Sequence, residues 1–426
     1  MRVFGLCLFL FMGCASANQA APKSNTSASS TSEDLRITKE SLTVMIDEIL
    51  PSLESVRGLS IGENIHTSVL DLQELSQYTR NVLADFLTEE ELLLQIKVMK
   101  MLGFFPLDFG GVEAFFDLYT SQILGVYDPK ENVLMVNGTS SFSELKMITA
   151  HELVHGLQDI HFDLEKYTKI TKSDSKTFYS DIDRARIFMI EGDAQGTVYT
   201  FLSAEKQPAK VNRSQLAQRN DYLLSLKTEE EKMANFIRYM AMPYHHAAQT
   251  IILYASDKGW SGVNELYKNL PTSTEQMMHV EKLIAREAFF SYYTSPEWIE
   301  VILPNFTHIF SDELGESGFL SLLADVATSP AQAMKYADGW NGDRFLVFQD
   351  NNILREPALL IGRTDWDSAQ DAQEFANGWK KYLQKHVGSK WPYFVSINDT
   401  AVIYGIGTSS EKIQKATWAS FQQTAK

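Results

Sequence analysis

One ten-residue stretch constrains this chain more than any other: residues 148–157, which read ITAHELVHGL. It contains His-Glu-x-x-His, and its remaining positions are uncharged or apolar, as in a helix buried beside a cleft. Residues four apart lie about 40° apart around a helix axis, so His151 and His155 project from one face and can bind one ion. Neutral imidazoles suit zinc, and Glu152 is placed to act on a metal-bound water. The alternative is an ordinary amphipathic helix that carries two histidines.

A third metal ligand is predicted in the motif Ile-Glu-Gly-Asp-Ala at residues 190–194. This motif lies in a long predicted helix, residues 181–205, which one polar loop separates from His155. Glu191 borders apolar residues, where a carboxylate needs a partner, and zinc would supply one. The small residues after it, beginning with Gly192, would let this helix approach the metal helix closely.

The first 17 residues have the pattern of a secretory signal peptide. Arg2 precedes an apolar run, Val3–Met12, that is too short to cross a bilayer. Cleavage after Ala17 would release a freely secreted chain that begins at Asn18. Cleavage before Cys14 would instead leave a lipid-modified cysteine and a lipoprotein anchored in a bacterial envelope. Both exits are open, and the lipoprotein is the first expectation.

The chain beyond this leader contains no cysteine, because the only two are Cys7 and Cys14. Disulfides and cysteine-ligated metals are therefore excluded. Residues 18–33, rich in Ser, Thr and Ala, are predicted to be a disordered tether. The formal charge of −16 argues against nucleic acid and anionic membrane surfaces as partners. Membrane contact is expected only through a lipid on Cys14.

The remaining chain is predicted to be α+β, mostly helical, in three parts. Residues 34–118 form a helical region, in which one apolar helix stops at Pro51 and another opens at the capping box of Thr88. Residues 119–300 form the catalytic region. Residues 301–426 form an α+β subdomain with a small antiparallel sheet.

A β-hairpin is predicted at residues 123–137, where two β-rich runs flank the turn Asp-Pro-Lys-Glu-Asn directly before the metal helix. A sheet edge beside such a helix commonly pairs with the substrate backbone in zinc peptidases. A hairpin that merely packs under the helix is an equal alternative. Asp159, four residues past His155, is expected to support that ligand. His161 falls off the ligand face.

These features resemble the gluzincin metallopeptidases, in which His-Glu-x-x-His is followed by a glutamate ligand on a later helix. More narrowly, the chain resembles an exported bacterial family. The shared motifs are Gly125–Pro129 (GVYDP), His151–Asp159 (HELVHGLQD), Glu191–Ala194 (EGDA), Ser273–His279 (STEQMMH), Gly339–Arg344 (GWNGDR) and Asp371–Phe375 (DAQEF). Val280 departs from the proline that the family often has. The resemblance spans nearly all of the chain after the tether, and it implies a zincin-like fold.

Peptide hydrolysis at such a site also needs a donor that stabilises the oxyanion of the tetrahedral intermediate. His279 is predicted to be this donor because it lies in a family motif, with Tyr244, His245 and His246 as alternatives. His279 pinning its own loop is the competing interpretation. The sequence thus predicts a zinc metallopeptidase acting on a peptide or protein, with Glu152 as the base. A zinc hydrolase of another amide or a cell-wall crosslink, and a non-catalytic zincin-fold binding lipoprotein, remain open.

Overall fold

The computed structural model describes residues 37–408 except 63–64, 85, 87, 139–141, 168, 291–295, 354–355 and 389. The predicted signal peptide, the tether and Cys14 therefore lie outside the described residues. Within the described part, none of the helices combines the length and the apolar character needed to cross a membrane.

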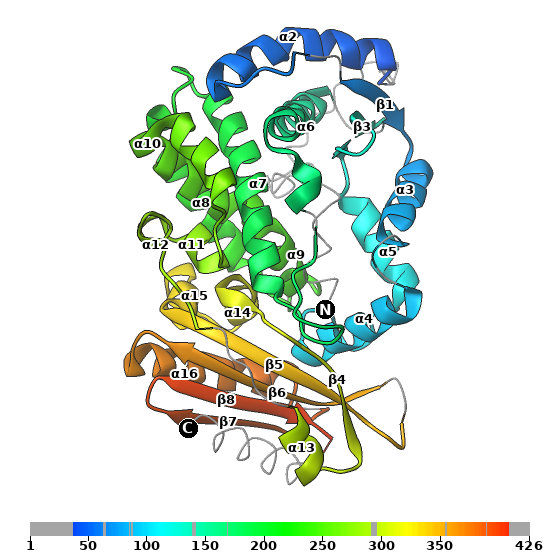
Figure 1. Cartoon of the computed structure of the whole chain (residues 1–426), viewed down its shortest axis with the longest axis vertical. Coiled ribbons are helices and arrows are strands. Elements are labelled where there is room, and N and C mark those ends of the chain that lie inside the picture. Colours follow the sequence, from blue (N-terminus) through cyan, green and yellow to red (C-terminus); the bar gives the residue numbers. More distant parts are fainter. Residues whose placement is uncertain are drawn as a thin grey trace, which may run out of the picture.

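The protein has an α+β architecture, in which a mainly helical body stands on a five-stranded sheet (Figure 1). The N-terminal elements are α2 (Lys39–Arg57), β1 (His66–Leu70), α3 (Leu72–Ala84), α4 (Glu89–Leu102) and α5 (Val112–Gln122). The predicted capping box of α4 is present, since Thr88 and Glu91 satisfy each other's backbone amides. Helix α2 was predicted to stop at Pro51, but it continues to Arg57. Its apolar stripe continues past the proline through the buried residues Leu53 and Val56, so packing maintains the helix.

The predicted hairpin consists of β2 (Gly125–Asp128) and β3 (Val133–Asn137), which pair antiparallel. Strand β1 adds to β3 in parallel, so the sheet order is β1-β3-β2 and β2 is an edge strand. The hairpin packs against α6 (Phe142–Phe162), the predicted metal helix, which follows it directly. A Cβ at Gly125 would lie 2.4 Å from the Ile148 side chain, so only glycine permits this close approach.

The helix predicted to carry the third ligand is α7 (Ser180–Leu202), which lies beside α6 in the body (Figure 1). It also packs against η3 (Pro243–Ala247), a π-helical turn that leads into α10 (Ala248–Lys268). Gly192 makes its close contact with Ala247 of η3. The small residue therefore lets α7 approach η3, and not α6 as the sequence suggested. The other described helices between α6 and the first strand of the C-terminal sheet are η1 (Leu164–Tyr167), η2 (Pro208–Lys210), α8 (Arg213–Ser225), α9 (Ala234–Met242), α11 (Thr274–Met278), α12 (Val280–Ala285) and α13 (Glu297–Ile302).

The C-terminal part contains the antiparallel sheet expected there, with strand order β4-β5-β6-β8-β7. Its elements are β4 (Phe306–Asp312), α14 (Gly315–Leu323), α15 (Pro330–Ala337), β5 (Trp340–Asp350), β6 (Pro357–Trp366), α16 (Ala369–His386), β7 (Tyr393–Asn398) and β8 (Ala401–Gly407). Trp379 of α16 packs edge-on against Phe319 of α14 and Tyr404 of β8, which joins the helices to the sheet.

Candidate metal centre

The structure brings the three predicted ligands together. The Nε2 atoms of His151 and His155 lie 3.0 Å apart. A carboxylate oxygen of Glu191 lies 3.0 Å from the first nitrogen and 3.5 Å from the second. All three side chains are buried, and each offers one atom that could bind the same metal ion. Helix α6 supplies the histidines from one face, and α7 supplies the glutamate.

This donor set fits zinc. Two imidazoles and a glutamate are a known catalytic zinc set, and tetrahedral bonds of 2.0–2.1 Å would place ligand atoms roughly 3.3 Å apart. The observed separations of 3.0, 3.0 and 3.5 Å agree with that spacing. Burial lowers the pKa of His151, which keeps its imidazole neutral. Burial raises the pKa of Glu191, but His155 and His151 lower it more, to about 2.

Glu152 lies beside this centre with a buried carboxylate. Neither of its oxygens has a hydrogen-bond partner among the described residues. Burial and the charge of Glu191 raise its pKa well above the usual value, and the nearby backbone N–H of Tyr127, which does not reach hydrogen-bond geometry, opposes them. A Cβ at Gly125 would lie 3.1 Å from its Cγ, so the glutamate adjoins the edge strand β2. A buried carboxylate without a partner is costly, which is typical of a group that completes its contacts with a ligand.

Gln158 supports His155, and Asp159 does not. The Gln158 Oε1 atom lies 2.7 Å from Nδ1 of His155, whereas Asp159 bonds the Tyr127 hydroxyl and the Leu164 backbone amide. The expectation for Asp159 is wrong because its carboxylate is engaged by the Tyr127 hydroxyl and the Leu164 amide, whereas Gln158 lies against the His155 ring. Sequence reasoning missed Gln158, although it lies within the quoted HELVHGLQD motif. His161 contacts the backbone of Ser60.

His279 bonds the buried carboxylate of Glu316, with Nε2 lying 2.8 and 3.0 Å from its two oxygens. Burial lowers the pKa of His279, but Glu316 outweighs it and raises the pKa to about 9. The aromatic ring that contacts the centre is instead Tyr244 of η3, whose centroid lies 5.7 Å from that of His151. Burial lowers the pKa of His245 to about 4 and that of His246 to about 3.

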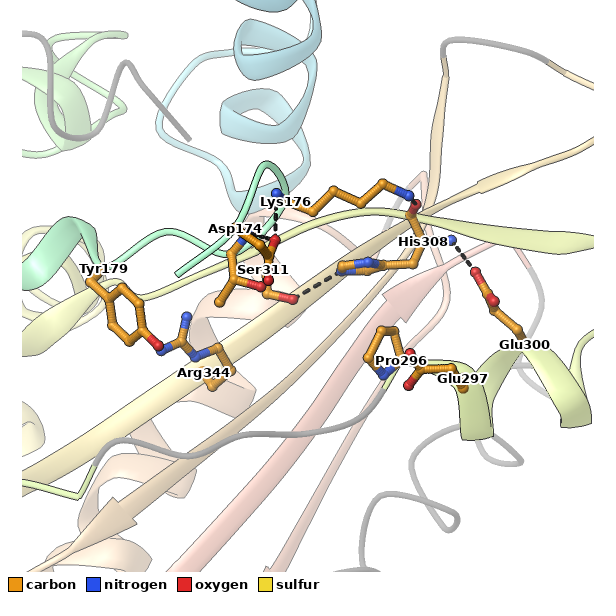
Figure 2. Close-up of a pocket in the computed structure, with 10 residues that line it drawn as sticks. Asp174, Lys176, Tyr179, Pro296, Glu297, Glu300, His308, Ser311 and Arg344 are labelled. Atoms are coloured by element: carbon orange, nitrogen blue, oxygen red, sulfur yellow. Dashed lines mark hydrogen bonds between the residues drawn. The ribbon is translucent and has the colours of Figure 1, made fainter. Parts of the chain in front are cut away.

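A separate polar pocket of about 220 Å³ lies where the loop before α7 meets α13, β4 and β5 (Figure 2). Its lining residues are Asp174, Lys176, Thr177, Tyr179, Pro296, Glu297, Glu300, His308, Ser311 and Arg344. Tyr179 precedes α7, and Glu191 lies about 18 Å further along that helix. The pocket is therefore distinct from the metal centre. Arg344 forms a buried ion pair with Glu313 at 2.7 Å, as expected for a structural salt link.

Part of the chain matches the model of a known protein family. Residues 305–413 match a domain of unknown function, DUF8575. This segment runs from the start of β4 to just past β8, so it includes Glu316 but none of the three candidate ligands. No curated protein and no solved structure matches the chain.

Proposed function

We propose that this chain is a zinc metallopeptidase with a zincin-like fold, in which His151, His155 and Glu191 hold the metal. One observation carries the proposal. Three ligand atoms from two helices meet within 3.5 Å of one another, next to the buried Glu152 carboxylate, which has no hydrogen-bond partner among the described residues. A metal site without a neighbouring base would suit a binding protein, whereas this combination suits hydrolysis.

Zinc, when bound, would supply Lewis-acid polarisation of a carbonyl and of water. Glu152 takes the proton of the attacking water and passes it to the leaving amine. Burial favours this role, because a base whose pKa is raised above that of a free carboxylate accepts a proton more readily near neutral pH. The carboxylate is fully buried, so a substrate has to displace neighbouring groups to reach it.

The edge strand β2 supports a peptide as the substrate. The amide of Asn137 donates to the Leu124 carbonyl at 2.8 Å, which fixes the alternation along β2. Val126 and Asp128 then face β3, and the backbone groups of Gly125 and Tyr127 face the outer edge of the sheet, which is buried in this structure. This edge lies beside Glu152. An extended peptide that added to it would place its backbone next to the base.

Tyr244 is favoured as the oxyanion donor. Its phenol is a hydrogen-bond donor and its ring contacts His151. His279 remains a prediction for this role, but its Nε2 is engaged with Glu316. Two features thus act together: Glu152 moves the proton, and Tyr244 stabilises the developing negative charge.

The test combines metal analysis with peptide cleavage. The wild-type protein should hold about one zinc per chain, and His155→Ala and Glu191→Ala should lose most of it. Glu152→Gln should keep zinc and lose cleavage of a proteome-derived peptide library by several orders of magnitude. Full zinc occupancy in Glu191→Ala would refute the ligand assignment. An active Glu152→Gln variant would refute the peptidase mechanism.

A further inference from the structure

A buried set of polar side chains lies on the Nδ1 side of His155. The Gln158 Oε1 atom, which can only accept, lies 2.7 Å from His155 Nδ1. Nδ1 therefore carries the ring proton. The lone pair of Nε2 is left to face His151 and Glu191, as a metal ligand requires.

Two acceptors fix the orientation of the Gln158 amide. Its Nε2 atom donates to the Ile190 carbonyl at 2.9 Å and to Asp193 Oδ2 at 3.1 Å. A reversed amide would place its oxygen against both acceptors and its NH₂ group against His155, which would force the wrong tautomer. The two acceptors thus determine, through one amide, which ring nitrogen of His155 is free for a metal.

Asp193 is held in turn by the N-terminal helix. Arg57, the last residue of α2, donates to its two oxygens from Nε at 2.8 Å and from Nη2 at 3.0 Å. The Tyr267 hydroxyl of α10 adds a bond of 2.7 Å to Oδ2. Arg57 also donates to Asn264 at 2.6 Å, and both members of the Arg57–Asp193 pair are fully buried.

We propose that Gln158, Asp193 and Arg57 form a positioning relay that sets the tautomer and orientation of His155. It follows that α2 is an integral part of the proposed metal centre. The inference rests on the proposed metal centre. A buried ion pair is weak evidence for stability, because desolvation offsets its attraction. Its position behind a ligand gives this pair a functional explanation. Mutation of a group that hydrogen-bonds a metal ligand typically lowers metal affinity by about 10–100-fold.

The test measures zinc affinity of the full-length chain by competition with a chelator. Gln158→Met, Asp193→Asn and Arg57→Met should each bind zinc about 10–100-fold more weakly than wild type. The matched control is Glu313→Gln, which disrupts another buried arginine–carboxylate pair by the same type of substitution. It should lower the melting temperature and leave zinc affinity unchanged. Cobalt substitution gives a second readout: the visible spectrum should change in the relay variants and not in the control.

Wild-type zinc affinity and an unchanged cobalt spectrum in the three relay variants would overturn the inference. If Asp193→Asn does not fold, Gln158→Met and Arg57→Lys decide, since they preserve side-chain volume or charge. Weak zinc binding in Gln158→Met together with normal binding in both Arg57 variants would remove α2 from the relay. A wild-type protein that binds no zinc would instead overturn the metal centre itself, so the two failures are distinguishable.

Discussion

Two glycines of α7 provide a matched pair of substitutions that tests how closely η3 packs against α7. A Cβ at Gly192 would lie 2.8 Å from Ala247 Cβ and 2.9 Å from the Ala247 carbonyl carbon and oxygen. A Cβ at Gly196, about one turn along, would meet Ile252 at 3.4 Å, which is ordinary contact. The clash at Gly192 includes backbone atoms of Ala247, so it can be relieved only if η3 moves.

The magnitudes separate the two variants. Replacing glycine by alanine inside a helix stabilises it by roughly 1 kcal/mol. That gain is common to both positions and cancels in the comparison. Overpacking costs roughly 1–3 kcal/mol, and we expect the upper part of this range for Gly192→Ala because the contact is with main chain. Gly192→Ala should therefore be about 2–3 kcal/mol less stable than Gly196→Ala.

Thermal denaturation of both variants checks this difference. In a chain of this size 1 kcal/mol corresponds to roughly 1–2 °C, so Gly192→Ala should melt about 2–6 °C below Gly196→Ala. Displacement of η3 should also move Tyr244 away from His151, and a shift of about 1 Å can cost about 10²-fold in rate. Equal melting temperatures and equal activities in the two variants would refute the close contact between α7 and η3.

Three further predictions follow from other parts of the chain. Tyr244→Phe should retain zinc and lower kcat by about 10²–10³-fold, whereas a larger kcat loss in His279→Ala with intact stability would return the oxyanion role to His279. Burial raises the pKa of Asp181 to about 7 from its usual 3.8, so folding retains a proton that the unfolded chain releases. Wild-type stability should therefore fall as pH rises from about 4 to 7, and urea denaturation should show a flatter profile for Asp181→Asn; identical profiles would contradict this. Cys14→Ser should move the protein from the membrane fraction to the soluble one, and a mature N-terminus at Asn18 would argue for free secretion instead.

Local patterns in the sequence predicted the elements that carry the candidate site. Helical spacing placed His151 and His155 on one face, and the next long helix contributed Glu191 at the expected place. The capping box of Thr88 and the hairpin before the metal helix also formed as predicted. These features depend on residues within a few positions of each other or on two neighbouring helices, so short-range rules suffice.

The missed features depend on contacts that are distant in sequence. Arg57 lies 136 residues from Asp193, and no local pattern indicates that a helix-terminal arginine will be buried against it. The stop signal at Pro51 was overridden because apolar residues on both sides of it pack into the core. The π-helical turn that brings Tyr244 to His151 likewise has no periodic signal.

The motif at Ser273–His279 makes contacts that explain its residues without a catalytic role, although the oxyanion role of His279 stays a prediction. Thr274 bonds Asp181 at 2.6 Å, Gln276 donates to the Glu287 carbonyl at 2.6 Å, and His279 bonds Glu316. The motif therefore joins the start of α7 to α14 of the matched domain, and these bonds give it an architectural role. Glu152 differs, because its buried oxygens have no partner among the described residues. Burial without a partner is costly, so it marks the group that a ligand is expected to complete, and by this criterion Glu152 is a stronger catalytic candidate than His279.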